Sequence, residues 1–387
     1  MLLRRGEVNP DKPDNEGRTP LSYAAADGKE EVAKMLLGRG EVDPDKLDNE
    51  GRTPLSYAAK HRYGEVVKML LAREEVNPDR PDNLGRTPLC YAIEAWHVFR
   101  AEWCAGVVNM LLGRNEVNPN GPDNGCRTPL SYAAEYGYEE VVKILLKHGE
   151  IKLDKPDNEG RTPLSYAAEY RYGEVVKMLL AREEVNPDKP DNLSRTPLYY
   201  AIATRRVFDA GGGIGVVKML LGRNEVNPDK PDDEGRTPLS YAPGRGYWCG
   251  AESHGGVVKM LLGCEDVNPD KPDNKGRTPL SYAADSGPVR VVGMILGREE
   301  VNPNKPDNGG QTPLSYAVMG GRVGMVKILL ERKEVDPGEP DNTGRTPLSH
   351  AAGEGQVEVV KILLGREEVN PYQPDNSGRT PLSYAAG

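Results

Sequence analysis

Short apolar patterns with a helical period recur along the chain, and one of the first follows Thr19. Leu21, Ala24 and Ala25 fall at i, i+3 and i+4, which places them on one face of a helix. Thr19 is a suitable N-cap residue, and Pro20 fits the first helical turn because its missing N–H has no partner to lose there. The pattern predicts a short helix that begins at Pro20 and ends at the glycine eight residues later.

A second helical pattern follows directly. Val32, Met35 and Leu36 repeat the i, i+3, i+4 spacing, and Glu30 and Glu31 precede them, where negative charge favours a helix N-terminus. The link to the next pattern, VNPDKPDNEG, holds two prolines that cannot donate to a sheet ladder and an Asn-x-Gly turn that accommodates positive φ. The sequence therefore predicts helix pairs separated by projecting hairpins, or fingers.

The tripeptide Thr-Pro-Leu occurs eleven times, and its spacing shows that the helix pair is a repeated unit. Seven of the ten intervals are 34 residues long, and the other three are 41. Three units are therefore lengthened, in segments 93–106, 202–215 and 243–256. Residues 62–84 also return almost unchanged at 171–193, which indicates that a block of three units was duplicated.

No single unit has enough apolar side chains for a closed core, so each must bury its stripes against its neighbours. The predicted fold is an all-α solenoid of stacked helix pairs with β-hairpin-like fingers. We expect one array over residues 1–387, with about ten full repeats and a partial repeat at each end. Because both ends cut through a unit, we expect a fragment of a longer protein or fraying ends.

The unit DNEGRTPLSYAA, followed by GKEEVAKMLL, resembles the ankyrin repeat. The family pattern is D-x-x-G-x-T-P-L-H-x-A-A and then a leucine-rich helix, and the chain is most similar to the long ankyrin arrays of filamentous fungi. Such arrays often form the recognition part of larger signalling proteins. Where the family has histidine, this chain has residues such as Ser22, Cys90 or Tyr199. We therefore expect the family's hydrogen bond at the helix start to be absent or made by a hydroxyl.

Composition and charge narrow the classes of partner. The formal net charge of −9 argues against nucleic acid, which requires a concentrated basic face. No apolar run approaches the roughly 20 residues of a membrane helix. The five cysteines contain no C-x-x-C pair, so reduced thiols are expected. These features favour a cytoplasmic protein, with a nuclear location also possible.

Residues for catalysis or for metal and cofactor binding do not assemble in the sequence. The five histidines lie in separate units, and the finger carboxylates lack the spacing of a calcium loop. The run GGGIG at 211–215 has no Gly-Lys-Ser/Thr after it, as a phosphate-binding loop would need. We expect no enzyme activity, no cofactor and no metal.

The lengthened segments hold all three Trp and both Phe of the chain. Aromatic residues and arginine are the types that most often anchor interfaces. The candidate partner-binding residues there are Trp96, Phe99, Arg100, Trp103, Arg205, Arg206, Phe208, Tyr247 and Trp248. Alternatively, Phe99 and Trp103 pack as a lid over their own helix pair, with Phe208 doing likewise.

A second candidate set lies at the end of the first helix of each unit, where the ankyrin resemblance places exposed positions on the concave face. Tyr136 and Tyr170 are the candidate anchors there, since tyrosine offers a large contact area at low entropy cost. They could also be ordinary surface tyrosines. The arginine before Thr-Pro-Leu, as at Arg18, is expected to pair with finger carboxylates such as Asp14.

The resemblance and these residues together lead to one main hypothesis. The chain is expected to be a non-catalytic, monomeric scaffold that binds a partner protein through its concave face and insertion loops. One alternative is a recognition segment of a larger signalling protein whose NTPase domain lies outside this chain. Another is a passive spacer.

Overall fold

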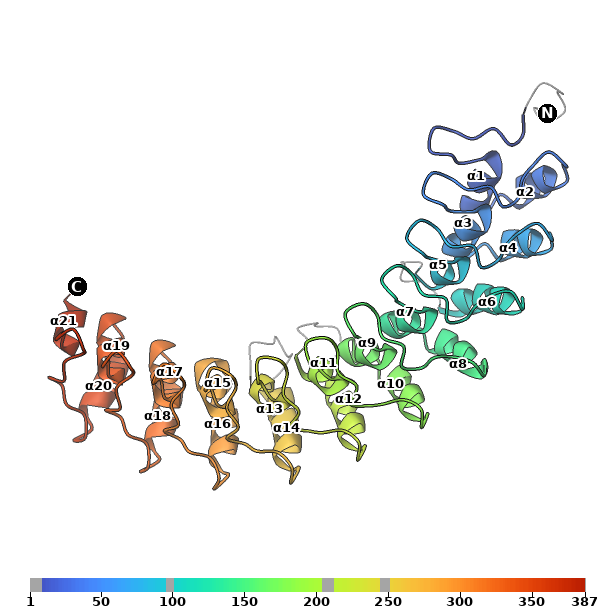
Figure 1. The fold of residues 1–387 in the computed structure, drawn as a ribbon. Helices are drawn as coiled ribbons and strands as arrows, with labels where there is room; N and C mark the ends of the chain where they lie inside the picture. The colour runs from blue at the N-terminus through green and yellow to red at the C-terminus, as the bar shows by residue number, and fades with distance from the viewer. Residues whose placement is uncertain (1–8, 95–100, 204–211, 244–250, 387) are drawn as a thin grey trace. The chain divides into compact units, whose positions relative to one another are not determined.

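A computed structural model describes residues 9–94, 101–203, 212–243 and 251–386 (Figure 1). The chain forms two compact units, residues 1–186 and 187–387. Within the described residues every regular element is a helix and no strand occurs. The first unit contains α1 (Pro20–Ala26), α2 (Glu30–Leu37), α3 (Pro54–His61), α4 (Gly64–Leu71), α5 (Pro88–Glu94), α6 (Ala101–Leu112), α7 (Pro129–Tyr136), α8 (Glu139–Lys147), α9 (Pro163–Glu169) and α10 (Gly173–Leu180).

The second unit continues the same alternation of helices. It contains α11 (Pro197–Ala203), α12 (Gly212–Leu221), α13 (Pro238–Tyr241), α14 (Ala251–Leu262), α15 (Pro279–Ser286), α16 (Val289–Leu296), α17 (Pro313–Met319), α18 (Val323–Leu330), α19 (Pro347–Gly353), α20 (Val357–Leu364) and α21 (Pro381–Ala385). In each unit the odd-numbered helices stack in one row and the even-numbered helices in a second row (Figure 1).

The start of each odd-numbered helix follows from the Thr-Pro pair. In α1 the Thr19 hydroxyl accepts the Ser22 N–H at 3.1 Å, and the two hydroxyl oxygens are also 3.1 Å apart. Where serine is replaced, the backbone bond remains: the N–H groups of Cys90 and Tyr199 donate to the preceding threonine at 3.4 and 3.3 Å. The expected hydroxyl substitute for the family's histidine is therefore present in the serine-containing units.

The apolar stripe of the odd-numbered helices is buried as predicted. Leu21 and Ala25 have no exposed surface and Ala24 only 3 %. Equivalent side chains in the following helices, such as Leu55 and Leu89, are also fully buried, because each helix lies between two neighbours. Burial of this kind stabilises the array only through contacts between successive repeats.

The predicted stripe of the second helix was wrong in detail. Val32 and Met35 are 39 % and 54 % exposed, so the buried face of α2 is turned away from them. The buried side chains of α2 are Ala33, Leu36 and Leu37. In the next repeat the counterpart of Val32 is Val66, which is fully buried between α2 and the helices that follow. The burial of this position therefore depends on a neighbouring helix pair, which the pattern of one segment does not contain.

Polar bonds between neighbouring repeats add to the apolar packing. An arginine after each of several even-numbered helices donates to the last turn of the preceding one, as Arg298 does to the Leu262 carbonyl at 2.7 Å. Such a cation also lies favourably at the negative end of the helix dipole. At the fingers, the side-chain amide of Asn83 donates to the Asn49 carbonyl at 3.0 Å, and Asn308 does the same to Asn274 at 3.1 Å. These contacts fix the register of one repeat on the next.

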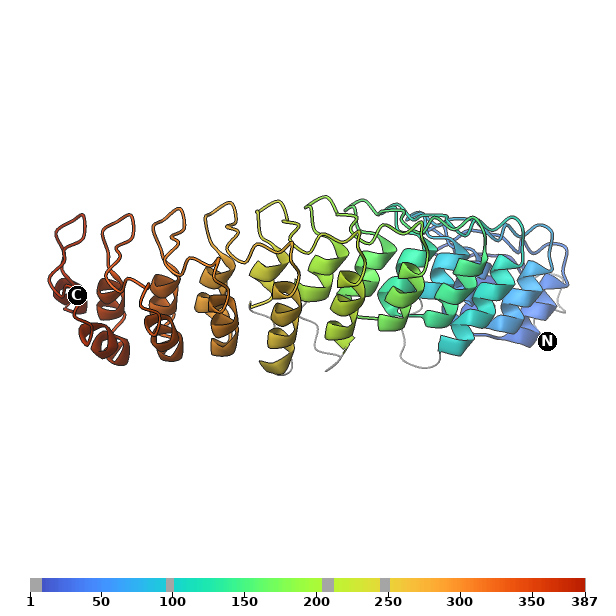
Figure 2. The same cartoon turned by 90° about the horizontal axis from the view of Figure 1, so that it is seen from below.

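Each finger closes by a hairpin-like bond, for example from the Asp14 N–H to the Arg18 carbonyl at 2.9 Å. In Figure 2 the fingers of the second unit project side by side along one edge of the helix rows. In most repeats the arginine before Thr-Pro-Leu contacts its own finger carboxylate, with Arg18 Nη2 at 3.2 Å from Asp14 Oδ2 and Arg52 Nε at 2.8 Å from Asp48 Oδ2. Arg127 and Arg277 pair instead with Glu135 and Asp285 in the helix that follows. The predicted pairing with carboxylates is confirmed for these arginines.

The same finger aspartate organises the helix that follows. Oδ2 of Asp82 accepts hydrogen bonds from Arg86 at 2.9 Å and from the Tyr91 hydroxyl at 2.6 Å, while Oδ1 accepts the Arg86 N–H at 2.8 Å. Burial works to raise the pKa of Asp82, but the bonds from Tyr91 and Arg86 outweigh it and hold the pKa below its ordinary value. This network ties each finger to its first helix. Gln311 replaces the arginine in one repeat, and His350 replaces the tyrosine in another.

Candidate partner-binding surface

The structure describes the side chains of two of the eleven predicted contact residues. Trp103 lies on α6, whose backbone is described. The predicted contacts outside the described residues are Trp96, Phe99, Arg100, Arg205, Arg206, Phe208, Tyr247 and Trp248. The choice between a lid and a binding surface for the insertions therefore stays a prediction. The described candidates are Tyr136 and Tyr170, both in the first unit.

Tyr136 and Tyr170 lie at equivalent places in successive repeats. Tyr136 ends α7, and Tyr170 follows the last residue of α9, which packs beside α7. Each ring lies against a second tyrosine two residues on. The ring centroids of Tyr136 and Tyr138 are 5.7 Å apart, and those of Tyr170 and Tyr172 are 6.0 Å apart and nearly parallel. We call these four side chains the tyrosine surface.

Sequence reasoning missed Tyr138 and Tyr172, although the Tyr-x-Tyr spacing in both repeats was available as a signal. The ring of Tyr172 packs against a glycine of the preceding repeat. Gly137 has φ +67°, and a Cβ there would lie 2.5 Å from the Tyr172 ring. Glycine suits this place because the ring from the next repeat approaches so closely; the left-handed backbone alone is also adopted by arginine at the equivalent positions Arg62 and Arg171.

Glu135 links the tyrosine surface to Arg127. The Tyr170 hydroxyl donates to Glu135 Oε1 at 3.3 Å, and Arg127 forms an ion pair with the other oxygen of Glu135. The Arg127 guanidinium also lies over the Tyr132 ring, 4.1 Å from its centroid. Burial, together with the negative charge of Glu135, raises the pKa of Tyr136 to about 12, so its hydroxyl stays neutral at physiological pH.

The four rings are half-buried, so their edges remain accessible while their positions are fixed by neighbours. The equivalent positions of later repeats carry no aromatic side chain; they are Ser286, Gly320 and Glu354. The tyrosine surface is therefore a feature of particular repeats and not of the repeated frame. Its chemistry suits contact with another molecule, because rigid tyrosines lose little entropy on binding.

The described residues contain no group of three or more His, Cys, Asp or Glu arranged to hold a metal ion. Cys90 is fully buried, and burial raises the pKa of its thiol to about 11, so it is a poor nucleophile. No helix among the described residues is both long and apolar enough to cross a membrane.

The stacked helix pairs and fingers define a protein of the helical repeat class, whose contact surfaces are built across successive repeats. The family model for ankyrin repeats, in three copies, matches residues 1–80, 41–103, 98–191, 207–306, 247–341 and 333–387. The chain belongs to the ankyrin repeat family, whose members are generally protein–protein interaction modules.

A solved structure supports the same fold. The crystal structure of the human ASB11 ankyrin repeat domain matches with a TM-score of 0.51 and 24 % sequence identity, over 63 % of this chain and 97 % of that one. Among curated proteins no match is found.

Proposed function

We propose that this chain binds a partner protein and that the tyrosine surface of the first unit is part of the contact. The observation that carries the proposal is the group formed by Tyr136, Tyr138, Tyr170 and Tyr172, fixed by mutual ring contacts and by Glu135. A surface already ordered before binding avoids much of the entropy loss that a flexible one would suffer. The acidic net charge favours a neutral or basic partner.

The test compares two variants of the intact chain in affinity capture from cell extract. Tyr136→Ala with Tyr170→Ala removes one ring from each pair of the tyrosine surface, and Tyr372→Ala removes a single ring that is 80 % exposed and lies far along the sequence. We expect the double variant to lose a captured protein that the wild type and Tyr372→Ala retain. Equal capture by all three proteins would refute the proposal, as would loss that merely follows a lowered melting temperature.

The insertion aromatics supply a second, separable contact in this proposal. Replacing Trp96, Phe99 and Trp103 by Ala should remove partners without changing the melting temperature if they bind, and should lower the melting temperature alone if they form a lid. In the alternative proposal the chain is the recognition segment of a larger signalling protein, whose catalytic domain lies outside these residues. We also propose that the isolated chain is a monomer, which sedimentation would measure.

A further inference from the structure

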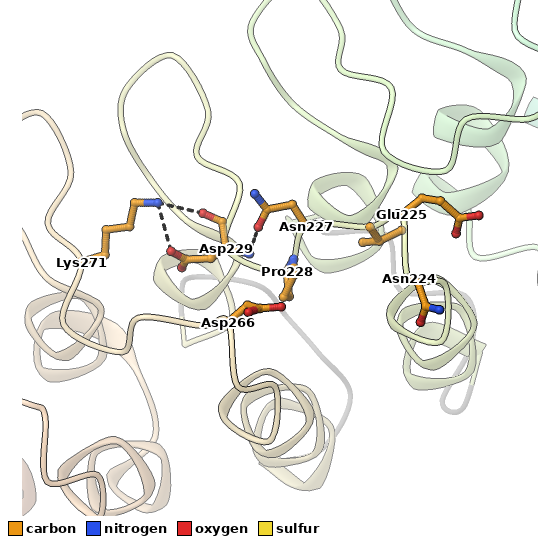
Figure 3. A pocket seen from close by; sticks show the side chains of 8 residues that line it. Asn224, Glu225, Asn227, Pro228, Asp229, Asp266 and Lys271 are labelled. Atoms are coloured by element: carbon orange, nitrogen blue, oxygen red, sulfur yellow. Dashed lines mark hydrogen bonds and ion pairs between the residues drawn. The ribbon is translucent and has the colours of Figure 1, made fainter.

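Neighbouring fingers are joined by a recurring ion pair. The Nζ atom of Lys271 donates to both the carbonyl oxygen and the Oδ2 atom of Asp229 in the preceding finger, each at 3.0 Å (Figure 3). Lys46 makes the same two bonds to Asp11, at 3.2 and 2.7 Å. The further examples in the described residues are Lys230 on Asp188, Lys305 on Asp270 and, through one bond, Arg80 on Asp45.

The cation compensates for a carboxylate that the fold has partly removed from water. Asp229 and Asp45 are 8 % and 5 % exposed. Burial raises the pKa of both carboxyls, whereas the bonds from Lys271 and Arg80 act in the opposite direction. Each lysine pair therefore forms a small socket, in which a carboxylate and a main-chain carbonyl together accept hydrogen bonds from one ammonium group.

At one junction the socket is present and the cation is not. The residue equivalent to Lys46 and Lys271 in the finger that follows Asp79 is Gly121. Among the described residues no ion pair reaches Asp79, whereas lysines bond to Oδ2 of the equivalent aspartates Asp11, Asp188, Asp229 and Asp270. Burial raises the pKa of Asp79, and only a backbone bond from Asn118 works against it.

At another junction the chain lacks both the cation and the carboxylate. Glu339 stands at the lysine position in one finger, and there the preceding aspartate is replaced by Asn304. The side-chain amide of Asn304 donates to the Glu334 carbonyl, and its Oδ1 accepts the Asp336 N–H at 3.0 Å, so the next finger satisfies both amide groups. The Asp79 junction has lost the cation and kept the carboxylate.

We propose that Asp79, with its own carbonyl oxygen, is a binding socket for a primary ammonium group, and that a lysine side chain of a protein partner fills it. The geometry is taken from four lysines of this chain, each of which bonds to the carbonyl and Oδ2 atoms of one aspartate. A lysine ammonium has three donors on a compact head, which suits two converging acceptors. This proposal depends on the proposed function in one respect only: the lysine comes from the partner protein.

Nuclear magnetic resonance of the intact chain labelled at the aspartate carboxyl carbons tests the socket directly. n-Butylammonium chloride is the probe, and tetramethylammonium chloride at equal ionic strength is the control, because it carries the charge without N–H donors. We expect a saturable shift of the Asp79 signal with butylammonium alone. A linear shift, or an equal shift with tetramethylammonium, would overturn the proposal.

Two variants supply matched controls. Gly121→Lys restores the missing cation and should abolish the butylammonium response and lower the pKa of Asp79 by roughly 0.2 to 0.7 pH unit, the range expected for one partly exposed ion pair. A Cβ at Gly121 would meet the Asn118 carbonyl oxygen at 3.3 Å, a contact that small adjustments relieve. Lys271→Gly should create the same response at Asp229.

The outcomes separate this proposal from the tyrosine surface. If Gly121→Lys leaves the Asp79 pKa and the butylammonium response unchanged, no socket exists. If the double tyrosine variant keeps the butylammonium response but captures no partner, both proposals stand. If the wild type captures no partner while the response persists, only the proposed function fails.

Discussion

Replacing Tyr91 by Phe removes one hydroxyl from the finger network and leaves the ring in place. Tyr91 is 1 % exposed, its hydroxyl donates to Asp82 Oδ2 at 2.6 Å, and it accepts a bond from Arg86 at 2.7 Å. A hydrogen bond to a charged group contributes about 1.5–3 kcal/mol to stability. Because Arg86 still reaches the carboxylate directly, we expect a loss of about 2 kcal/mol in the Tyr91→Phe variant.

The variant should also change how stability depends on pH. The pKa of Asp82 is lower in the folded protein than in the unfolded chain, so its contribution is complete above the unfolded pKa and is lost as pH falls through the folded one. Without the Tyr91 hydroxyl, burial is opposed less strongly and the folded pKa rises. The acid-dependent loss of stability should therefore begin at the same pH in Tyr91→Phe and in the wild type, but be smaller and complete at a higher pH in the variant.

Hydrogen exchange measures this effect locally, since a long repeat array need not unfold as one unit. The amides of α5 should lose protection in Tyr91→Phe. The matched control is Tyr23→Phe, which removes the same 2.6 Å bond to Asp14 from a tyrosine that is 43 % exposed. We expect a smaller loss of protection in α1, because water can replace the hydroxyl there. Equal losses in the two variants would show that burial does not strengthen the bond, and the reasoning would fail.

Two further substitutions test the contacts between repeats. Gly137→Ala should destabilise by about 1–2 kcal/mol, because φ is +67° and the new methyl group meets the Tyr172 ring; thermal unfolding measures this, with Gly149→Ala, where nothing lies within 4 Å of the added Cβ, as the control. Similar melting temperatures for the two alanine variants would contradict the argument. Asp79→Asn should stabilise by about 1 kcal/mol at neutral pH, because an amide there can donate to the next finger as Asn120 does at 2.7 Å. Urea unfolding measures it, and a lower midpoint would show that the carboxylate is better satisfied than the contacts indicate.

The sequence predicts most of the repeated frame because its determinants are local. The cap at Thr19, the proline after it and the Leu-Ala stripe all act within one helix, so their spacing was enough to place α1. The buried face predicted for α2 was wrong, because Val32 is exposed while its counterpart Val66 is buried by neighbouring helices. That difference arises between repeats, and no pattern within one repeat contains it.

In the candidate site, too, the sequence predicts some residues and misses others. The 34-residue spacing predicts that Tyr136 and Tyr170 lie at equivalent places of successive repeats, and α7 and α9, at whose ends they lie, pack side by side. Their role in partner binding stays a prediction. The adjacent rings of Tyr138 and Tyr172 were missed, because ring contacts such as Tyr138 with Tyr136 and Tyr172 with Gly137 of the preceding repeat appear only in the folded chain. The Asp, Arg and Tyr of the finger network recur at a regular spacing in the sequence. Only the folded chain shows that the arginine and the tyrosine both bond to the aspartate carboxylate.

Because the repeats are nearly identical, a substitution at one junction between fingers can be compared with the equivalent residues at the other junctions. In most fingers a positive-φ glycine faces the asparagine of the next finger, and a Cβ at Gly235 would lie 2.5 Å from the Asn274 side-chain oxygen. Ser194 takes that glycine position with φ 59°, and the residue facing it is Asp233 in place of asparagine, which accepts the serine hydroxyl at 2.5 Å. The two departures compensate each other within one junction. Asp79 and Gly121 form a junction without such compensation, which is the physical reason to look for a compensating group in another molecule.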